Sequence, residues 1–452
     1  MQKRATIRIF LFSMFVLTAG CGRTQYAGEW DANQRDGGLD VEVTDSRPDR
    51  PGDATPTCIS GQLRCQGDRL QICLNGSFAD QKDCSYGCTQ QPSPHCGTPV
   101  WSNQVTNDDM EAGLEDAVLL PGEVVLDTDT GLFTGPGAPS AVPFRVVDRS
   151  SMGLPDLIIL PFLSLRVRSG CIVSFVGSRI PVIVAKGDIS IEGILDLSAG
   201  HNGRPGPGGY PGGIDGAPGS GPGAGSAGLL GPLRVQEGGG GGAGFGGLGG
   251  AGGNTATAPG GAAGRAYGNP QLDPIVGGSG GGSGAKGDSS NPGGGGAGGG
   301  AIALMSLTRV QVLTDGMILA GGGGGLGGGL NDAGGGGGSG GAILLAAPEV
   351  RILGVLAANG GAGGGSDTTP PQDGATGDGS DQPAQPGSGG GAGGAGTTPD
   401  AVSADEASLH GSGGGGGCGR IRIESRDEPI LGGLISPSPQ TPLTTLVPLP
   451  VE

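Results

Sequence analysis

The sequence predicts a mainly β fold, an irregular parallel β-solenoid with long glycine-rich excursions, preceded by a small disulfide-rich module. Three observations predict it. Glycine contributes 106 of the 452 residues and aromatic residues only 3%, which is far from the composition of a domain with a conventional core. Cysteines crowd into residues 58–96. Farther along the chain a short β-branched unit recurs, with glycine tracts between its copies.

The first 20 residues are typical of an export signal. Basic residues precede the apolar segment Ile9–Leu17, which is too short to span a bilayer. The sequence LTAGC that ends at Cys21 resembles a bacterial lipobox, and this resemblance implies cleavage before Cys21 and lipidation of its sulfur. Gly22 rather than Asp after the cysteine implies, by the same resemblance, transport to the outer membrane. The alternative is an ordinary secretory signal with a chance cysteine.

Residues 21–57 are rich in Asp, Arg, Gly and Pro and carry almost no periodic apolar residues, so we expect a disordered tether. Residues 58–97 follow as a cysteine-rich module. In an exported chain such spacing indicates disulfides, whose connectivity the sequence leaves open. The candidates are Cys58, Cys65, Cys73, Cys84, Cys88 and Cys96. A zinc knuckle is the alternative, although only His95 lies nearby and no C-x-x-C pair repeats.

The cysteine module contains the elements Gly61–Cys65 and Gly87–Cys88. With them it resembles a small module at the head of many secreted proteins of myxobacteria. The resemblance implies no activity.

Residues 98–155 are predicted to be a connecting β segment or cap, residues 156–436 the solenoid, and residues 437–452 a proline-rich tail. Short β-branched runs, too short for helices, support this division. They are residues 124–126, 144–147, 157–160, 163–167 and 171–176.

A longer unit repeats at residues 181–200, 301–321 and 342–360, which align with a one-residue insertion in the middle copy. Apolar and polar residues alternate with period two in all copies, as in strands with one buried face. The predicted inward residues are Val182, Ile189, Ile191, Ile302, Val310, Val312, Ile343, Val350 and Ile352. The predicted outward row is Ser190, Gln311 and Arg351. Residues 419–434 are a candidate fourth, degraded copy.

Each copy contains three very short strands that cannot bury an apolar face alone, whereas stacked copies bury one continuous column. This logic favours a solenoid. A β-sandwich of unrelated strands is the alternative.

Glycine tracts occupy residues 200–300, 321–341 and 359–419. Glycines at 203, 206, 209 and 212 keep a three-residue frame that Asp215 breaks, so a collagen triple helix is excluded. Two interpretations stay open. The tracts are either flexible loops ejected from one side of the solenoid, or polyproline-II-like strands packed side by side through backbone hydrogen bonds, which only glycine permits at such close approach.

The glycine-rich body, with its GGA and GGX runs, resembles glycine-rich surface proteins of myxobacteria. It resembles more distantly the glycine-rich part of mycobacterial PE-PGRS proteins, whose diagnostic N-terminal domain is missing. No function carries over from this compositional likeness.

The sequence contains only weak matches to catalytic and ligand-binding motifs. The patterns at 277–281 and 337–341 fit G-x-S-x-G formally, but glycine density makes such matches inevitable. No phosphate-binding loop occurs, and His95, His201 and His410 each lie in a turn or glycine-rich context. We therefore predict no catalytic residues, no cofactor and no firm metal site. The weak calcium candidates are Asp367, Asp373, Asp378 and Asp381.

Two cysteines, Cys171 and Cys418, remain outside the module. They lie near the start and the end of the predicted solenoid, so a disulfide between them requires the last strand to return beside the early ones. Whether they pair is left open.

A net charge of −17 disfavours nucleic acid and anionic membrane as partners. We expect an exported, non-enzymatic, lipid-anchored protein of the outer membrane or cell surface with a structural, display or adhesive role. Its expected partners are the membrane, through the lipid, and an extracellular polysaccharide or protein. The alternative is a carbohydrate-active or carbohydrate-binding β-solenoid, for which the candidate carboxylates are Asp188, Glu192, Asp196 and Glu349.

Overall fold

The computed structural model describes residues 58–113, 115–200, 203–232, 235–287 and 291–452. The predicted leader, the lipidation site Cys21, the tether 21–57 and His201 lie outside these residues. Helices are short where the chain is described: α1 spans Asn107–Glu111 and a 3-10 turn spans Ser150–Met152. None of the described helices has the length and apolar character needed to cross a membrane.

The cysteine module is a small antiparallel sheet closed by disulfides. Its strands are β1 (Leu63–Gln66), β2 (Arg69–Leu74) and β3 (Ser77–Asp83), followed by the pair β4 (Cys88–Thr89) and β5 (His95–Cys96). The disulfides are Cys58–Cys73, Cys65–Cys88 and Cys84–Cys96. Asn75 and Gly76 both have positive φ and turn the chain between β2 and β3, as the two residues of a tight hairpin require.

Three large sheets follow, which we name sheets 1, 2 and 3. Sheet 1 contains, in spatial order, β9 (Arg145–Val147), β10 (Leu157–Phe162), β13 (Ile180–Ala185), β16 (Ala301–Ser306), β19 (Ala342–Ala347), β22 (Arg420–Ser425) and β25 (Thr444–Pro448). Sheet 2 contains β6 (Asp116–Leu119), β11 (Ser164–Val167), β14 (Ile189–Ile191), β17 (Arg309–Val312), β20 (Glu349–Ile352) and β23 (Ile430–Leu431). Sheet 3 contains β8 (Leu132–Thr134), β7 (Gly122–Asp127), β12 (Cys171–Val176), β15 (Ile194–Asp196), β18 (Met317–Leu319), β21 (Val355–Ala357) and β24 (Leu434–Ser436).

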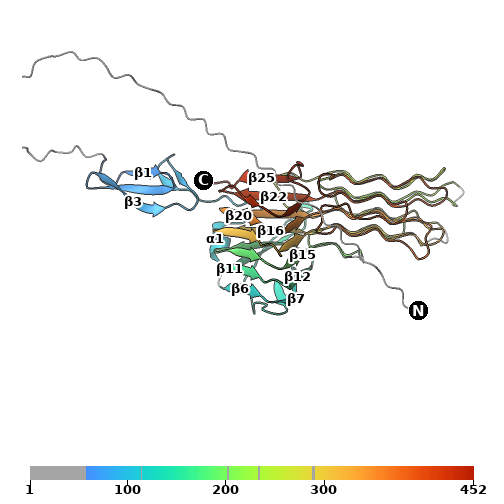
Figure 1. Ribbon diagram of the computed structural model, residues 1–452, viewed down its shortest axis with the longest axis horizontal. Coiled ribbons are helices and arrows are strands. Elements are labelled where there is room, and N and C mark those ends of the chain that lie inside the picture. The colour runs from blue at the N-terminus through green and yellow to red at the C-terminus, as the bar shows by residue number, and fades with distance from the viewer. Residues whose placement is uncertain (1–57, 114, 201–202, 233–234, 288–290) are drawn as a thin grey trace, which may run out of the picture. The chain divides into compact units, whose positions relative to one another are not determined.

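The chain visits the three sheets in rotation, and each strand pairs in parallel with its counterpart one repeat later. Antiparallel pairing within these sheets occurs only where β8 and β9 join β7 and β10. The glycine tracts all leave after a strand of sheet 3 and return at a strand of sheet 1. The protein is therefore mainly β with mostly parallel sheets, as predicted, and the long excursions share one corner of the stack (Figure 1).

The predicted inward row is confirmed. Ile189 pairs with Val310, and Val310 pairs with Val350, so equivalent residues lie side by side in sheet 2. All of them are buried in one apolar cluster. The outward row pairs in the same way, Ser190 with Gln311 and Gln311 with Arg351. Period-two alternation thus placed both faces of this sheet correctly.

The prediction for Val182 is wrong. Val182 pairs with Ala303 rather than with Ile302, and it is buried on the opposite face of sheet 1 from Ile302 and Ile343. Between its second and third strands the unit has two extra residues in the middle copy. Between its first two strands the unit has the same length in the first two copies, and the third copy is one residue shorter in its bend before Glu349. Misplacing that single residue moves the side chain to the other face of the sheet.

Sheet 1 has an apolar core on each face, which explains why its strands read as continuous apolar runs. The inner face joins sheets 2 and 3 in the main core. The outer face is covered by Trp101, Val105 and Met110 from the segment before β6 and by Phe245 and Ile275 from the glycine-rich region.

The sheets extend beyond the predicted boundaries. Strands β6 and β7, inside the predicted cap 98–155, pair with β11 and β12. Strand β25, inside the predicted tail, pairs with β22.

The glycine tracts run side by side as extended strands away from the sheets (Figure 1). Successive amides of one tract donate to different neighbours with a period of three: Gly239 to Gly253, Gly240 to Gly334, Gly241 to Ser226, then Gly242 to Gly250, Ala243 to Gly337 and Gly244 to Gly223. This is the three-residue period of polyproline II, here with hydrogen bonds between strands. The interpretation of the tracts as flexible loops is therefore wrong, and the packed interpretation holds.

We call this region the glycine bundle; it comprises residues 203–232, 235–287, 291–300, 320–341 and 358–419. A central tract bonds to six others: residues 237–246 contact 222–229, 247–254, 259–267, 276–285, 333–341 and 411–418. Backbones lie so close that a Cβ on Gly296 would come within 2.0 Å of the carbonyl oxygen of Gly323. Glycine is required at such central positions because any side chain would occupy the neighbour's backbone.

Candidate functional site

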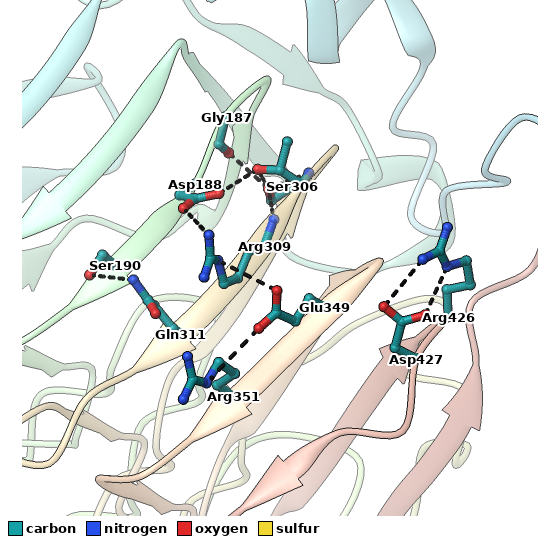
Figure 2. A network of polar contacts seen from close by, with 11 residues as sticks. Gly187, Asp188, Ser190, Ser306, Arg309, Gln311, Glu349, Arg351, Arg426 and Asp427 are labelled. Atoms are coloured by element: carbon teal, nitrogen blue, oxygen red, sulfur yellow. Dashed lines mark hydrogen bonds and ion pairs between the residues drawn. The ribbon is translucent and has the colours of Figure 1, made fainter. Parts of the chain in front are cut away.

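The outward face of sheet 2 carries interlocking charges (Figure 2). Arg309 lies between two carboxylates, 3.0 Å from Asp188 and 3.8 Å from Glu349, and Arg351 lies 3.9 Å from Glu349. Thr308 donates a further hydrogen bond of 2.6 Å to Asp188. Acidic and basic groups therefore alternate from one repeat to the next.

The remaining carboxylates proposed for an enzyme are also engaged. Glu192 accepts from Arg166 at 2.7 Å, and Asp196 lies on β15 of sheet 3, where it accepts from the Ser198 amide at 3.0 Å. The structure does not bring Asp196 onto the face that holds Asp188 and Glu349. Paired acid–base catalysis needs two carboxylates facing one substrate. Carboxylates neutralised by arginines across adjacent strands instead stabilise the stacking of repeats.

The two formal G-x-S-x-G matches place Ser279 and Ser339 in the interior of the bundle. Both side chains are fully buried. The Ser279 amide donates to the Ser339 hydroxyl at 2.8 Å, and the Ser279 hydroxyl donates to Tyr267 at 3.0 Å. Burial raises the pKa of Tyr267. These serines join tracts and are inaccessible to a substrate.

The four aspartates considered for calcium do not converge. Asp367 and Asp373 precede the tract 374–377 and accept from the amides of Asn331 and Gly327. Asp378 and Asp381 follow that tract, about 15 Å farther along for polyproline-II geometry. Within the described residues no group of three or more His, Cys, Asp or Glu side chains could hold a metal ion.

The cysteines outside the module are not bridged. Cys171 lies in the main core and Cys418 in the glycine bundle, and both are free and buried. Burial raises the pKa of each thiol. The contemplated disulfide is therefore not formed.

Turns at the far end of the bundle present exposed aliphatic side chains. Ile214 is 71% exposed, Leu330 67% and Val235 61%. Leu229 and Leu409 are also exposed, and they flank the buried Glu237, whose amide donates to the Leu409 carbonyl. We call the described turn residues 214–217, 229–232, 235–236, 254–258, 329–332, 366–369 and 406–409 the distal turns.

The distal turns are bonded to one another. Asn331 donates its amide to Asp367 at 3.1 Å, and Gln236 donates to the Ser408 carbonyl at 3.1 Å. The His410 imidazole lies 2.8 Å from Asp367 and is buried, although its sequence context is glycine-rich. Sequence reasoning missed this surface. At two of its positions a sequence signal existed, since Ile214 and Leu330 are single aliphatic residues between Gly and Asp or Asn inside a glycine tract.

No protein-family model, curated protein or solved structure matches this chain. The candidate surfaces therefore rest on their own geometry.

Proposed function

We propose that this chain is a non-enzymatic, lipid-anchored cell-surface protein that displays the distal turns for adhesion. In this proposal the three sheets form a closed β-solenoid, the glycine bundle is a rigid extension of it, and a lipid on Cys21 holds the N-terminus at the outer membrane. The myxobacterial surface-protein likeness is part of the same proposal.

The observation that carries the proposal is the set of exposed aliphatic residues on turns that are hydrogen-bonded to one another. Exposed Ile, Leu and Val add nothing to a core, and turns that are hydrogen-bonded to one another hold these side chains in fixed positions where a partner can contact them. Rigid presentation also lowers the entropy lost on binding.

The test is a whole-cell binding assay and a glycan array with the purified mature chain. We expect saturable binding that falls at least fivefold in a double variant, Ile214→Ser with Leu330→Ser. Leu132→Ser is the matched control, because Leu132 is 52% exposed on β8, outside the bundle. Equal binding by the double variant, or no binding in either assay, would contradict display by the distal turns.

The anchor has its own test. Cys21→Ala should release the protein from membranes, and labelled palmitate should enter only the wild type. A Cys21→Ala protein that stays unprocessed and membrane-bound would contradict lipidation at this residue.

A further inference from the structure

The last repeat of the sheets is incomplete in a way that exposes the main core. Leu446 of β25 pairs with Ile423 of β22, which pairs with Leu345 of β19. Parallel in-register partners point to the same face, so Leu446 faces the core. Ile423 and Leu345 are fully buried, whereas Leu446 is 42% exposed. Sheet 1 has a strand in this last layer, and sheets 2 and 3 end one layer earlier, at β23 and β24.

The edge of β24 has free backbone groups. Leu434 donates its amide to Gly354, and Ser436 accepts from the Ala358 amide, so residues 434 and 436 face β21. Alternation along a strand turns the N–H and C=O of Ile435 to the opposite side, and among the described residues β21 is the only strand paired with β24. An unpaired edge of this kind is a template for another strand.

A groove of 410 Å³ lies along this edge. Leu431, Gly433, Leu434 and Ile435 line it, together with Asp381, Gln382, Gly396, Thr397, Ser438 and Pro439. The groove thus combines apolar side chains, backbone groups at strand spacing and one carboxylate.

The opposite end of the stack is built differently. Strand β8 pairs along the outer edge of β7, and β9 pairs along β10. Beyond β6, Leu120 donates its amide to Pro136. Antiparallel strands and a turn therefore cover the edges of the first repeat, while β23 and β24 have no such cover among the described residues.

We propose that the free edges of β23 and β24 bind an extended peptide strand of a partner protein, which completes the last layer of sheets 2 and 3. Backbone N–H and C=O groups of the peptide pair with Ile435, alternate apolar side chains cover Leu431 and Leu446, and a basic residue lies beside Asp381. Strand addition of this type takes its affinity from main-chain hydrogen bonds and its specificity from alternate side chains. The proposal is independent of adhesion by the distal turns.

The probe is a fluorescent peptide with the sequence of residues 348–358, PEVRILGVLAA, followed by two lysines, because Asp381 lies beside Gly396 and Ser436, at the end of β24 where Ala357 pairs with Ser436. This sequence already pairs with β23 and β24 from the inner side, so its side chains fit that layer. We expect saturable binding to the purified chain by fluorescence anisotropy, at least tenfold tighter than a scrambled peptide of the same composition. Equal binding of the two peptides, or none, would overturn the proposal.

Two variants, one control variant and a hydrogen-exchange measurement locate the site. Ile435→Pro removes the free N–H and spares the bonds to β21, a position where an edge strand tolerates proline, and should weaken binding at least tenfold. Asp381→Lys should weaken binding of the peptide severalfold, while Val118→Ser on β6, at the covered end, should bind the peptide as the wild type does.

Hydrogen exchange on the wild type should show the Ile435 amide protected only with peptide, and the Leu434 amide protected throughout. Protection of Ile435 that appears with protein concentration alone, together with dimers in solution, would assign the edge to a second copy and overturn a separate partner.

Discussion

The sheets and the glycine bundle both pack extended strands side by side, but the sheets do so with apolar side chains and the bundle with backbone contacts. In the sheets, Val310, Val350 and their neighbours bury apolar side chains, and the strands are spaced to accommodate them. In the bundle, tracts such as 237–246 have almost no side chains and approach until backbone meets backbone. The first region is stabilised mainly by removing apolar surface from water, and the second by satisfying a dense set of peptide hydrogen bonds. The two regions should therefore respond to different substitutions.

The largest expected effect is a charge in the sheet core. Val350→Asp buries a carboxylate without a partner and should lower the free energy of unfolding by about 4 kcal/mol, or force protonation of the new side chain. Urea unfolding followed by circular dichroism measures it. Arg351→Gln is the control on the outward face and should cost about 0.5 kcal/mol. An unchanged midpoint for Val350→Asp would show that the aligned row does not form one core.

In the glycine bundle, a single added methyl group should lower the stability, as a buried charge does in the sheets. Gly296→Ala places a Cβ 2.0 Å from the Gly323 carbonyl oxygen, so the tracts must separate, at a cost of about 3 kcal/mol. Gly294→Ala is the matched control in the same tract, because its Cβ meets nothing closer than 3.5 Å. Gly294→Ala should leave the free energy of unfolding unchanged or raise it slightly. If both variants unfold at the wild-type temperature, the bundle is not packed as described.

Acid should lower the stability of the two regions to different extents, because Asp109 and Arg145 support the sheets, whereas residues 334–341 of the bundle have no titrating side chain. Burial alone would raise the pKa of Asp109, but hydrogen bonds from Arg145 and Thr106 outweigh it and hold the pKa below its ordinary value of 3.8. A depressed carboxyl pKa adds stability above pH 3.8 that is lost as pH falls through the folded-state value. Asp109→Asn should remove this dependence and cost about 2 kcal/mol at neutral pH. Hydrogen exchange between pH 4 and 2.5, corrected for intrinsic rates, should show amides near β9 losing protection before those of residues 334–341.

The smallest effect concerns the two free cysteines, one in each region. Neither Cys171 nor Cys418 should react with a thiol reagent in the native protein, because both are buried with raised pKa values. Unfolding without reductant should expose two thiols in a Cys21→Ala chain. A count of zero would mean that these cysteines pair after all.

Prediction from sequence succeeded where the period was short and failed where partners lie far apart along the chain. Alternation in Ser190–Ile191 and its equivalents fixed the faces of sheet 2, because each strand reports its own pattern. Val182 was misplaced because the alignment carried no sign of which bend was one residue shorter. The free edge of β24 was also beyond reach, since it depends on which strands are missing from the last layer.

In the glycine bundle, prediction from sequence failed for a different reason. The frame of Gly206, Gly209 and Gly212 was interpreted only as a failed collagen repeat. In the structure it marks a tract with one face packed in the bundle, since a Cβ at each of these positions would meet backbone within 3 Å. Asp215, which ends the frame, lies in a distal turn. A three-residue glycine frame that breaks off thus marks a surface tract, and an unbroken glycine run such as 238–242 marks a central one.

The position of residues 411–419 has a consequence for the order of assembly. This tract is the last of the bundle to leave the ribosome, yet its carbonyl and amide groups bond to the central tracts 237–246, 333–341 and 358–366. Early repeats of the sheets can stack as soon as they emerge, whereas the amides of Gly334, Gly337 and Gly340 find their acceptors only when Gly411, Gly414 and Gly417 arrive. The bundle therefore closes around its final segment, and a chain truncated before residue 410 would keep most of its sheets while its central glycine tracts stayed open to water.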